Sequence, residues 1–220
     1  MNKAQILLVV ATLPEIFPTI QAYKLSPTDS AHIWTSENIT VLITGVGMTN
    51  TAYYLGKYLH EYSPNLAINA GIGGSFDKNI PLGTAVEIIE DTFSEMGAED
   101  KNQFLTMEAL GFPLYQTPDT IYYNTFLQPN PSSLPIPKTT AITVNTVHGE
   151  TESINKCIMQ WNKQIETMES AAFFQIMIAE KIPFLAFRGI SNYVEPRNRE
   201  NWKIKEAVLA VNEVINLFLP

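Results

Sequence analysis

The sequence has one cysteine, few basic residues and no long apolar run, and each shortage excludes a class of protein. With Cys157 alone no internal disulfide can form, and we expect this residue to be a small core side chain. No apolar stretch approaches the roughly 20 residues that cross a bilayer. The 14 Lys and Arg residues face 22 Asp and Glu residues, for a net charge of −8, and form no run. We therefore expect no nucleic-acid or membrane partner, and predict a cytoplasmic protein that acts on a small molecule.

Ligands for a metal or a nucleotide cofactor are scarce as well. The 3 histidines, His32, His60 and His148, are scattered without metal-ligand spacing. The turn at 45–47 lacks the third glycine of the dinucleotide fingerprint, and no Gly-Lys-Ser/Thr motif occurs. We expect neither a metal nor an organic cofactor. His148 has no nucleophile beside it in the sequence, so a hydrogen-bonded structural role is favoured over a catalytic one.

Apolar patterning predicts a single α/β domain over residues 1–220, with three layers and a mixed central β-sheet flanked by helices. Apolar runs bounded by turn residues predict strands at 6–11, 39–44, 66–70, 84–89, 139–144 and 182–190. The first run is a strand rather than a signal peptide, because Pro14 and Pro18 interrupt the apolar character that follows it.

Helical periodicity is clearest in the second half of the chain. Residues Met168, Ala171, Ala172, Ile176 and Ala179 recur at helical spacing and predict a helix that packs on the sheet. An amphipathic pattern predicts a closing helix over 201–219. The proline- and tyrosine-rich segment 100–137 predicts a long excursion, and its role stays open between covering a pocket, contacting a dimer partner and none.

Polar residues fall where the predicted strands end. Glu15 and Glu169 lie at strand-to-helix junctions, and Asn192 follows the strand at 182–190. Ligands collect at the carboxyl ends of parallel strands, so a carboxylate and an amide are expected to meet at one cleft. The structural alternative is that the glutamates complement helix dipoles and that the asparagine makes a turn. Likewise, the glycines of 71–73 admit a ligand to the backbone or simply form a flexible turn.

Two motifs carry a resemblance to a known family. Met168-Glu169 and Arg188-Gly-Ile-Ser-Asn192 resemble the ribose and base motifs of purine nucleoside phosphorylases and nucleosidases, and the likeness covers nearly the whole chain. Within that superfamily, IPLGTAVEIIEDTFSE, NTVHGE and ISNYVEPRNRENW look most like segments of the futalosine hydrolases, enzymes of an alternative menaquinone pathway. The resemblance implies hydrolysis of the N-glycosidic bond of futalosine, with release of hypoxanthine, by a homodimer.

The resemblance also implies a role for each polar residue. Glu169, beside Met168, would bind the ribose hydroxyls through charge-assisted hydrogen bonds. Asn192 would donate a hydrogen bond to N7 of the departing purine, and Glu15 would deprotonate water.

Two further regions acquire roles in this way. Val147 would wall the purine pocket, and the backbone of Gly71, Ile72 and Gly73 would face the substrate. Phosphorylases of the superfamily carry a phosphate-binding arginine just before these glycines, where this chain has Asn69. That departure points to water rather than phosphate as the acceptor.

Futalosine carries a carboxyphenyl-ketone tail on its ribose, which calls for an apolar slot and a cation. Arg197 or Arg199 is expected to bind the tail carboxylate bidentately; the alternative is that both are solvated loop residues. Three other functions stay open at this point. They are a methylthioadenosine or adenosylhomocysteine nucleosidase, a purine nucleoside phosphorylase, and a purine-binding protein without catalysis.

Overall fold

Strands and helices alternate along the chain in a computed structural model that describes residues 5–101 and 103–220. The strands are β1 (Ile6–Val10), β2 (Ser26–Pro27), β3 (Ile33–Thr35), β4 (Ile39–Ile43), β5 (Leu66–Ser75), β6 (Ala85–Phe93), β7 (Gly97–Asp100), β8 (Gln103–Thr106), β9 (Tyr115–Gln116), β10 (Ile121–Tyr122), β11 (Thr125–Leu127), β12 (Lys138–Thr143), β13 (Ile165–Thr167) and β14 (Phe184–Tyr193). The helices are α1 (Leu13–Ala22), α2 (Met48–Glu61), α3 (Met107–Leu110), α4 (Thr151–Trp161), α5 (Ser170–Glu180) and α6 (Ile204–Asn216), with a 3₁₀ turn at Arg199–Asn201.

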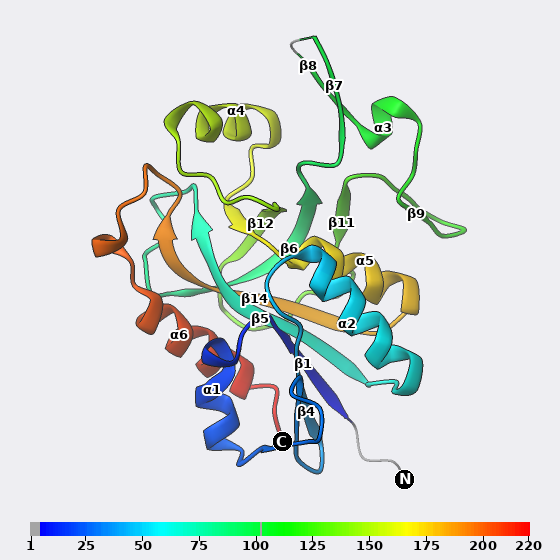
Figure 1. Ribbon diagram of the computed structural model, residues 1–220, viewed down its shortest axis with the longest axis vertical. Helices are drawn as coiled ribbons and strands as arrows, with labels where there is room; N and C mark the ends of the chain where they lie inside the picture. The colour runs from blue at the N-terminus through cyan, green and yellow to red at the C-terminus, as the bar shows by residue number, and fades with distance from the viewer. Residues whose placement is uncertain (1–4, 102) are drawn as a thin grey trace.

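A mixed sheet lies at the centre, in the order β11-β6-β12-β13-β5-β1-β4-β3-β2. β14 pairs in parallel with β5 and antiparallel with β6. Because β5 also connects to β6 through β13 and β12, these strands close into a ring of hydrogen-bonded pairs. Helices cover both faces of the sheet (Figure 1). The prediction of a three-layer α/β fold with a mixed central sheet is confirmed.

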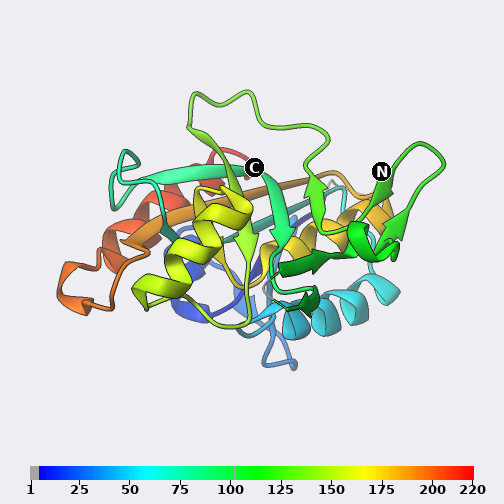
Figure 2. The same cartoon turned by 90° about the horizontal axis from the view of Figure 1, so that it is seen from above.

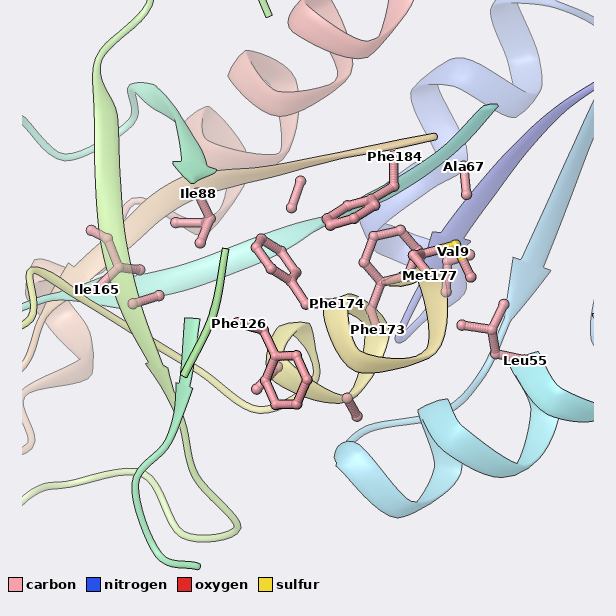
Figure 3. Packing of buried hydrophobic residues seen from close by; sticks show 14 of the residues in the cluster. Val9, Leu55, Ala67, Ile88, Phe126, Ile165, Phe173, Phe174, Met177 and Phe184 are labelled. Carbon is pink, nitrogen blue, oxygen red and sulfur yellow. The ribbon is translucent and has the colours of Figure 1, made fainter. Parts of the chain in front are cut away.

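Alternation along the strands builds two apolar layers, because successive side chains point to opposite faces. In β1, Leu7 and Val9 belong to the layer beneath α2 and α5, whereas Leu8 and Val10 belong to the layer beneath α1 and α6. Figure 3 shows the first layer, in which Phe174 of α5 packs against Phe184 of β14 with ring centroids 4.9 Å apart. Side chains on both faces of the sheet thus fix the helices that carry the polar residues described below.

Several elements differ in length from their predictions. The strand predicted at 66–70 continues to Ser75, because the glycine-rich backbone pairs with β14 on one side and β13 on the other. That stretch is therefore an ordered strand and not a loop. The strand predicted at 182–190 also runs on, to Tyr193, across an irregularity between Ile190 and Asn192. The closing helix is shorter at both ends than its predicted span of 201–219: a 3₁₀ turn ends at Asn201 before it, and the helix itself ends at Asn216.

The segment 94–128 makes two short hairpins and α3, and then rejoins the main sheet where β11 pairs with β6. Figures 1 and 2 show this excursion at the opposite end of the molecule from α6. It is anchored by buried Asn124, whose side chain donates to the carbonyls of Phe93 and Met96. The excursion predicted from the prolines is present, and its return strand makes it an extension of the sheet.

Candidate active site

A cavity of about 370 Å³ opens where β1, β5, β13 and β14 end, the edge at which ligands collect in sheets of this kind. Eight of the residues proposed from the sequence line it: Glu15, Ile72, Gly73, Val147, Met168, Glu169, Asn192 and Arg197. Gly71 lies just behind this wall, and Arg199 does not line the cavity. Residues separated by more than 150 positions in sequence are thus brought to a common surface.

Glu15 is oriented by donors from two elements. Its Oε2 accepts hydrogen bonds from the backbone N–H and the hydroxyl of Thr12, at 2.9 and 2.7 Å. Its Oε1 accepts from the N–H of Ile72 at 3.1 Å. A Cβ on Gly71 would lie 2.8 Å from this Oε1, so glycine is needed for the carboxylate to reach β5. The carboxylate is held in place, yet remains at the cavity surface.

Glu169 is the residue before α5 and is only 8% exposed. Its Oε1 accepts a hydrogen bond from the N–H of Gly47 at 3.0 Å. Gly47 has φ +96°, which favours glycine, so the turn at 45–47 presents its amide to a carboxylate. Burial raises the pKa of Glu169, and the charge of Arg188 and the Gly47 amide oppose that rise.

Arg188 begins one of the two motifs named above, but the sequence did not indicate a role for its side chain. It is 1% exposed in the middle of β14, with Nη2 4.0 Å from Glu169 Oε2. Its Nη2 also donates to Asn69 Oδ1 at 2.6 Å and its Nη1 to the carbonyl of Phe187 at 2.9 Å. Among the described residues its Nε has no hydrogen-bond partner. A charged residue inside the apolar run Phe184–Ile190 was the available signal.

Asn69 is buried under the cavity floor. Its amide donates to the carbonyl of Val9 at 2.9 Å, and its oxygen accepts from Arg188. Where phosphorylases of the superfamily are expected to carry a phosphate-binding arginine, this chain thus has a neutral side chain, and that side chain binds Arg188. It offers no contact to a ligand in the cavity.

Asn192 lies just after the irregularity in β14. The hydroxyl of Ser191 donates to its Oδ1 at 2.8 Å, and its Nδ2 donates to the carbonyl of Tyr193 at 3.0 Å. An amide nitrogen carries two protons, so one remains for an acceptor on a ligand. Gly74 packs against this amide, where a Cβ would lie 3.2 Å from Nδ2.

Comparison with known proteins shows the superfamily of the chain. A model of the phosphorylase superfamily matches residues 29–218. The chain belongs to the phosphorylase superfamily. Two curated relatives are futalosine hydrolases: that of Thermus thermophilus is 26% identical over 184 residues, which are 81% of this chain and 80% of that protein. That of Streptomyces coelicolor is 29% identical over 163 residues, 71% of this chain and 66% of that protein.

Solved structures of other superfamily members share the fold. A 5′-methylthioadenosine/S-adenosylhomocysteine nucleosidase of Neisseria meningitidis, in complex with methylthio-immucillin-A, superposes with a TM-score of 0.77 at 14% identity over 96% of each chain. Futalosine hydrolase of Helicobacter pylori superposes with a TM-score of 0.75 at 12% identity, over 97% of this chain and 96% of that one. At these identities the likeness concerns the fold alone.

In this phosphorylase-superfamily chain, one wall of the cavity contains an ion pair between His148 and Glu166, which the sequence did not reveal. His148 donates its backbone N–H to the carboxylate of Glu166 at 3.2 Å, and its Nδ1 pairs with the same carboxylate. Cys157 and Glu166 raise the pKa of His148 to about 10. The imidazole is therefore protonated at neutral pH. The hydrogen-bonded structural role that the sequence favoured for His148 is thus played by a charged side chain.

The two loop arginines differ in position. The guanidinium of Arg197 lies 5.4 Å from the ring centre of Trp202, and both residues line the cavity. Arg199 stacks on the same ring at 5.8 Å, outside the cavity lining. Met168 also lines the cavity and packs on the cluster around Cys157.

Among the described residues, no three His, Cys, Asp or Glu side chains are grouped to hold a metal ion. In the same part of the chain, no helix is both long and apolar enough to cross a membrane.

We predict that Arg188→Met lowers the free energy of unfolding by about 3–5 kcal/mol, because it leaves the buried Glu169 charge without its cation. Adding Glu169→Gln to that variant should restore part of the loss, since the uncompensated charge is then absent. Urea unfolding of the single and double variants measures the coupling, with Arg197→Met as an exposed control. Equal losses with and without Glu169→Gln would contradict a pairing of the two residues.

Proposed function

We propose that this protein is a nucleosidase that hydrolyses the N-glycosidic bond of futalosine, giving hypoxanthine and dehypoxanthine futalosine in menaquinone biosynthesis. One observation carries the proposal: Glu15 and Glu169 present two separately held carboxylates to one cavity, beside the amide of Asn192. The similarity to two futalosine hydrolases supports the choice of substrate.

Cleavage of an N-glycosidic bond builds positive charge on the ribose and negative charge on the base. Glu169 stabilises the ribose side by accepting hydrogen bonds from the sugar hydroxyls. Its own contacts to Gly47 and Arg188 orient the carboxylate and favour its charged form against the effect of burial, so little reorganisation is needed in the transition state.

Asn192 stabilises the negative charge on the base, because its remaining amide proton is donated to N7 as the purine leaves. Val147 and the backbone of Gly73 flank the base, since both line the cavity near this amide. A purine anion is therefore a better leaving group here than in water.

Glu15 deprotonates the attacking water. We predict that Glu15→Gln folds normally and still binds substrate, but loses about 100- to 10,000-fold in kcat, the usual contribution of a general base. Glu169→Ala should damage both binding and turnover, which separates the two carboxylates. Steady-state release of hypoxanthine, followed by ultraviolet absorbance, measures both variants. Near-normal kcat in Glu15→Gln would remove this residue from the mechanism.

Water is the acceptor, because Asn69, a buried neutral side chain outside the cavity lining, occupies the position where a phosphate-binding cation would be required. We predict that the base is released at the same rate with and without phosphate when the protein is incubated with futalosine, inosine or methylthioadenosine, the base being hypoxanthine from the first two and adenine from the third. Futalosine should be the preferred substrate. Formation of a ribose 1-phosphate product, at a rate that follows phosphate concentration, would instead indicate a phosphorylase. Preference for methylthioadenosine would indicate the nucleosidase alternative.

The acidic tail of the substrate is bound by Arg197 rather than Arg199, because Arg197 lines the cavity and Trp202 orients it. Arg199 shares the stacking on Trp202 and therefore provides a matched comparison. Loss of affinity for futalosine, with unchanged affinity for inosine, is expected in Arg197→Ala and not in Arg199→Ala.

The active form is a cytoplasmic homodimer. Large exposed apolar side chains on α2 and the excursion support pairing of two copies: Tyr53, Tyr62, Met96, Phe112, Ile121 and Leu127. Light scattering of the purified protein measures its mass in solution directly.

We predict that Asn192→Asp weakens cleavage of a 6-oxopurine nucleoside, because an ionised carboxylate presents only acceptors to N7 and O6. The ratio of kcat/KM for futalosine to that for its 6-amino analogue should shift towards the amino analogue by roughly 10- to 100-fold, as expected for about 1–3 kcal/mol at an unpaired buried group. An unchanged ratio would mean that Asn192 does not read the base.

A further inference from the structure

Another carboxylate, that of Asp91 in β6, lies beneath the start of α5 and is 0% exposed. The hydroxyl of Ser170 donates to its Oδ2, and the hydroxyl of Thr143 donates to its Oδ1 at 2.9 Å. Asp91 does not line the cavity, so it makes no contact with a substrate bound there. None of the roles assigned above explains why a charge is buried at this position.

The partners of Asp91 hold the chain on both sides of Glu169. Thr143 Oγ1 accepts the backbone N–H of Ala171 at 2.9 Å, two residues after Glu169. Thr167 Oγ1, two residues before it, lies 2.9 Å from Thr143 Oγ1 and 2.7 Å from Ser170 Oγ. The short segment that carries Glu169 is thus fastened at each end to one network.

We propose that Asp91 is a positioning residue for the nucleosidase reaction, which fixes the Glu169 carboxylate against the ribose through Ser170, Thr143 and Thr167. This inference rests on the proposed function, because it takes the ribose hydroxyls as the ligand of Glu169.

The negative charge of Asp91 fixes the direction of each hydrogen bond in the network. An ionised carboxylate only accepts hydrogen bonds, so Ser170 and Thr143 must both donate to it and keep their oxygens free to accept. Thr143 can then receive the Ala171 N–H, and Ser170 can receive the hydroxyl of Thr167. An asparagine at position 91 presents a donor to one of these hydroxyls and forces it to turn, which breaks this order.

The surroundings of Asp91 permit the charge. Burial raises its pKa to about 6, while the hydrogen bonds from Ser170 and Thr143 and the charge of Arg188 act in the opposite direction. The group is therefore still ionised at neutral pH. The N-terminus of α5, with its positive dipole end, lies directly against it.

β6 supplies a matched control, because Glu87 on the same strand is also 0% exposed. Its carboxylate accepts from Gln128 Nε2 at 2.7 Å and from the backbone and hydroxyl of Ser132 at 2.7 and 2.6 Å. These contacts fasten the loop before β12 and do not involve the segment around Glu169. Glu87→Gln therefore removes a buried charge from β6 without changing the Glu169 network.

The test compares Asp91→Asn with Glu87→Gln on futalosine and on its 2′,3′-dideoxy analogue, which lacks both ribose hydroxyls for Glu169. Asp91→Asn should lower kcat/KM for futalosine by about 10- to 100-fold, as expected for a misplaced catalytic group. The loss should be largely absent with the analogue, because the contact that Asp91 supports is already missing. Equal losses on both substrates, or the same pattern in Glu87→Gln, would overturn the proposal. If Asp91→Asn does not fold, Ser170→Ala replaces it in the same comparison of kcat/KM losses on the two substrates.

A readout without substrate separates this inference from the proposed function. Hydrogen exchange of the Ala171 amide should accelerate in Asp91→Asn and stay unchanged in Glu87→Gln. Unchanged exchange in Asp91→Asn would overturn the network. If the unaltered protein releases no base from any nucleoside, the proposed function fails, and with it the part of the inference that concerns the ribose.

Discussion

The rest of the site depends on the interaction between the buried guanidinium of Arg188 and the carboxylate of Glu169. Glu169 is almost fully buried beside a cavity that also contains Glu15, and charges of the same sign raise each other's free energy in a medium of low polarisability. A cation inside the sheet offsets that cost without occupying the cavity. Asn69 and the carbonyl of Phe187 hold it there, which explains why a polar pair interrupts otherwise apolar strands.

The closed arrangement of strands makes this placement possible. β5 and β14 run in parallel and side by side for their whole length, so Asn69 on one strand faces the strand that carries Arg188. Both strands continue to the cavity, where Ile72 of β5 and Asn192 of β14 form part of its lining. Backbone amides do much of the orienting: Ile72 and Thr12 hold Glu15, and Gly47 holds Glu169. Such donors are fixed by the fold and lose no side-chain entropy when substrate binds.

The sequence predicted the layers of the fold and the polar strand ends, because both depend on local patterns. Periodicity located the sheet and its helices, and Glu15, Glu169 and Asn192 were apparent as polar residues that follow apolar runs. The continuation of β5 through Gly71–Ser75 was not predictable in this way, since glycine has low strand preference and only long-range pairing orders it. Arg188, Glu166 and Asp91 were not assigned roles for a related reason: each acquires its role from partners distant in sequence.

The charges around the cavity bear on the choice between water and phosphate. Glu15, Glu166, Glu169 and Glu195 line it, against the positive charges of His148 and Arg197. The charge of His148 is already paired with Glu166, and Arg197 lies in the exposed loop after β14. A phosphate dianion beside Glu15 and Glu169 would therefore be repelled by two carboxylates, whereas a neutral water molecule would not be. The same negative field would favour positive charge that develops on a molecule bound in the cavity.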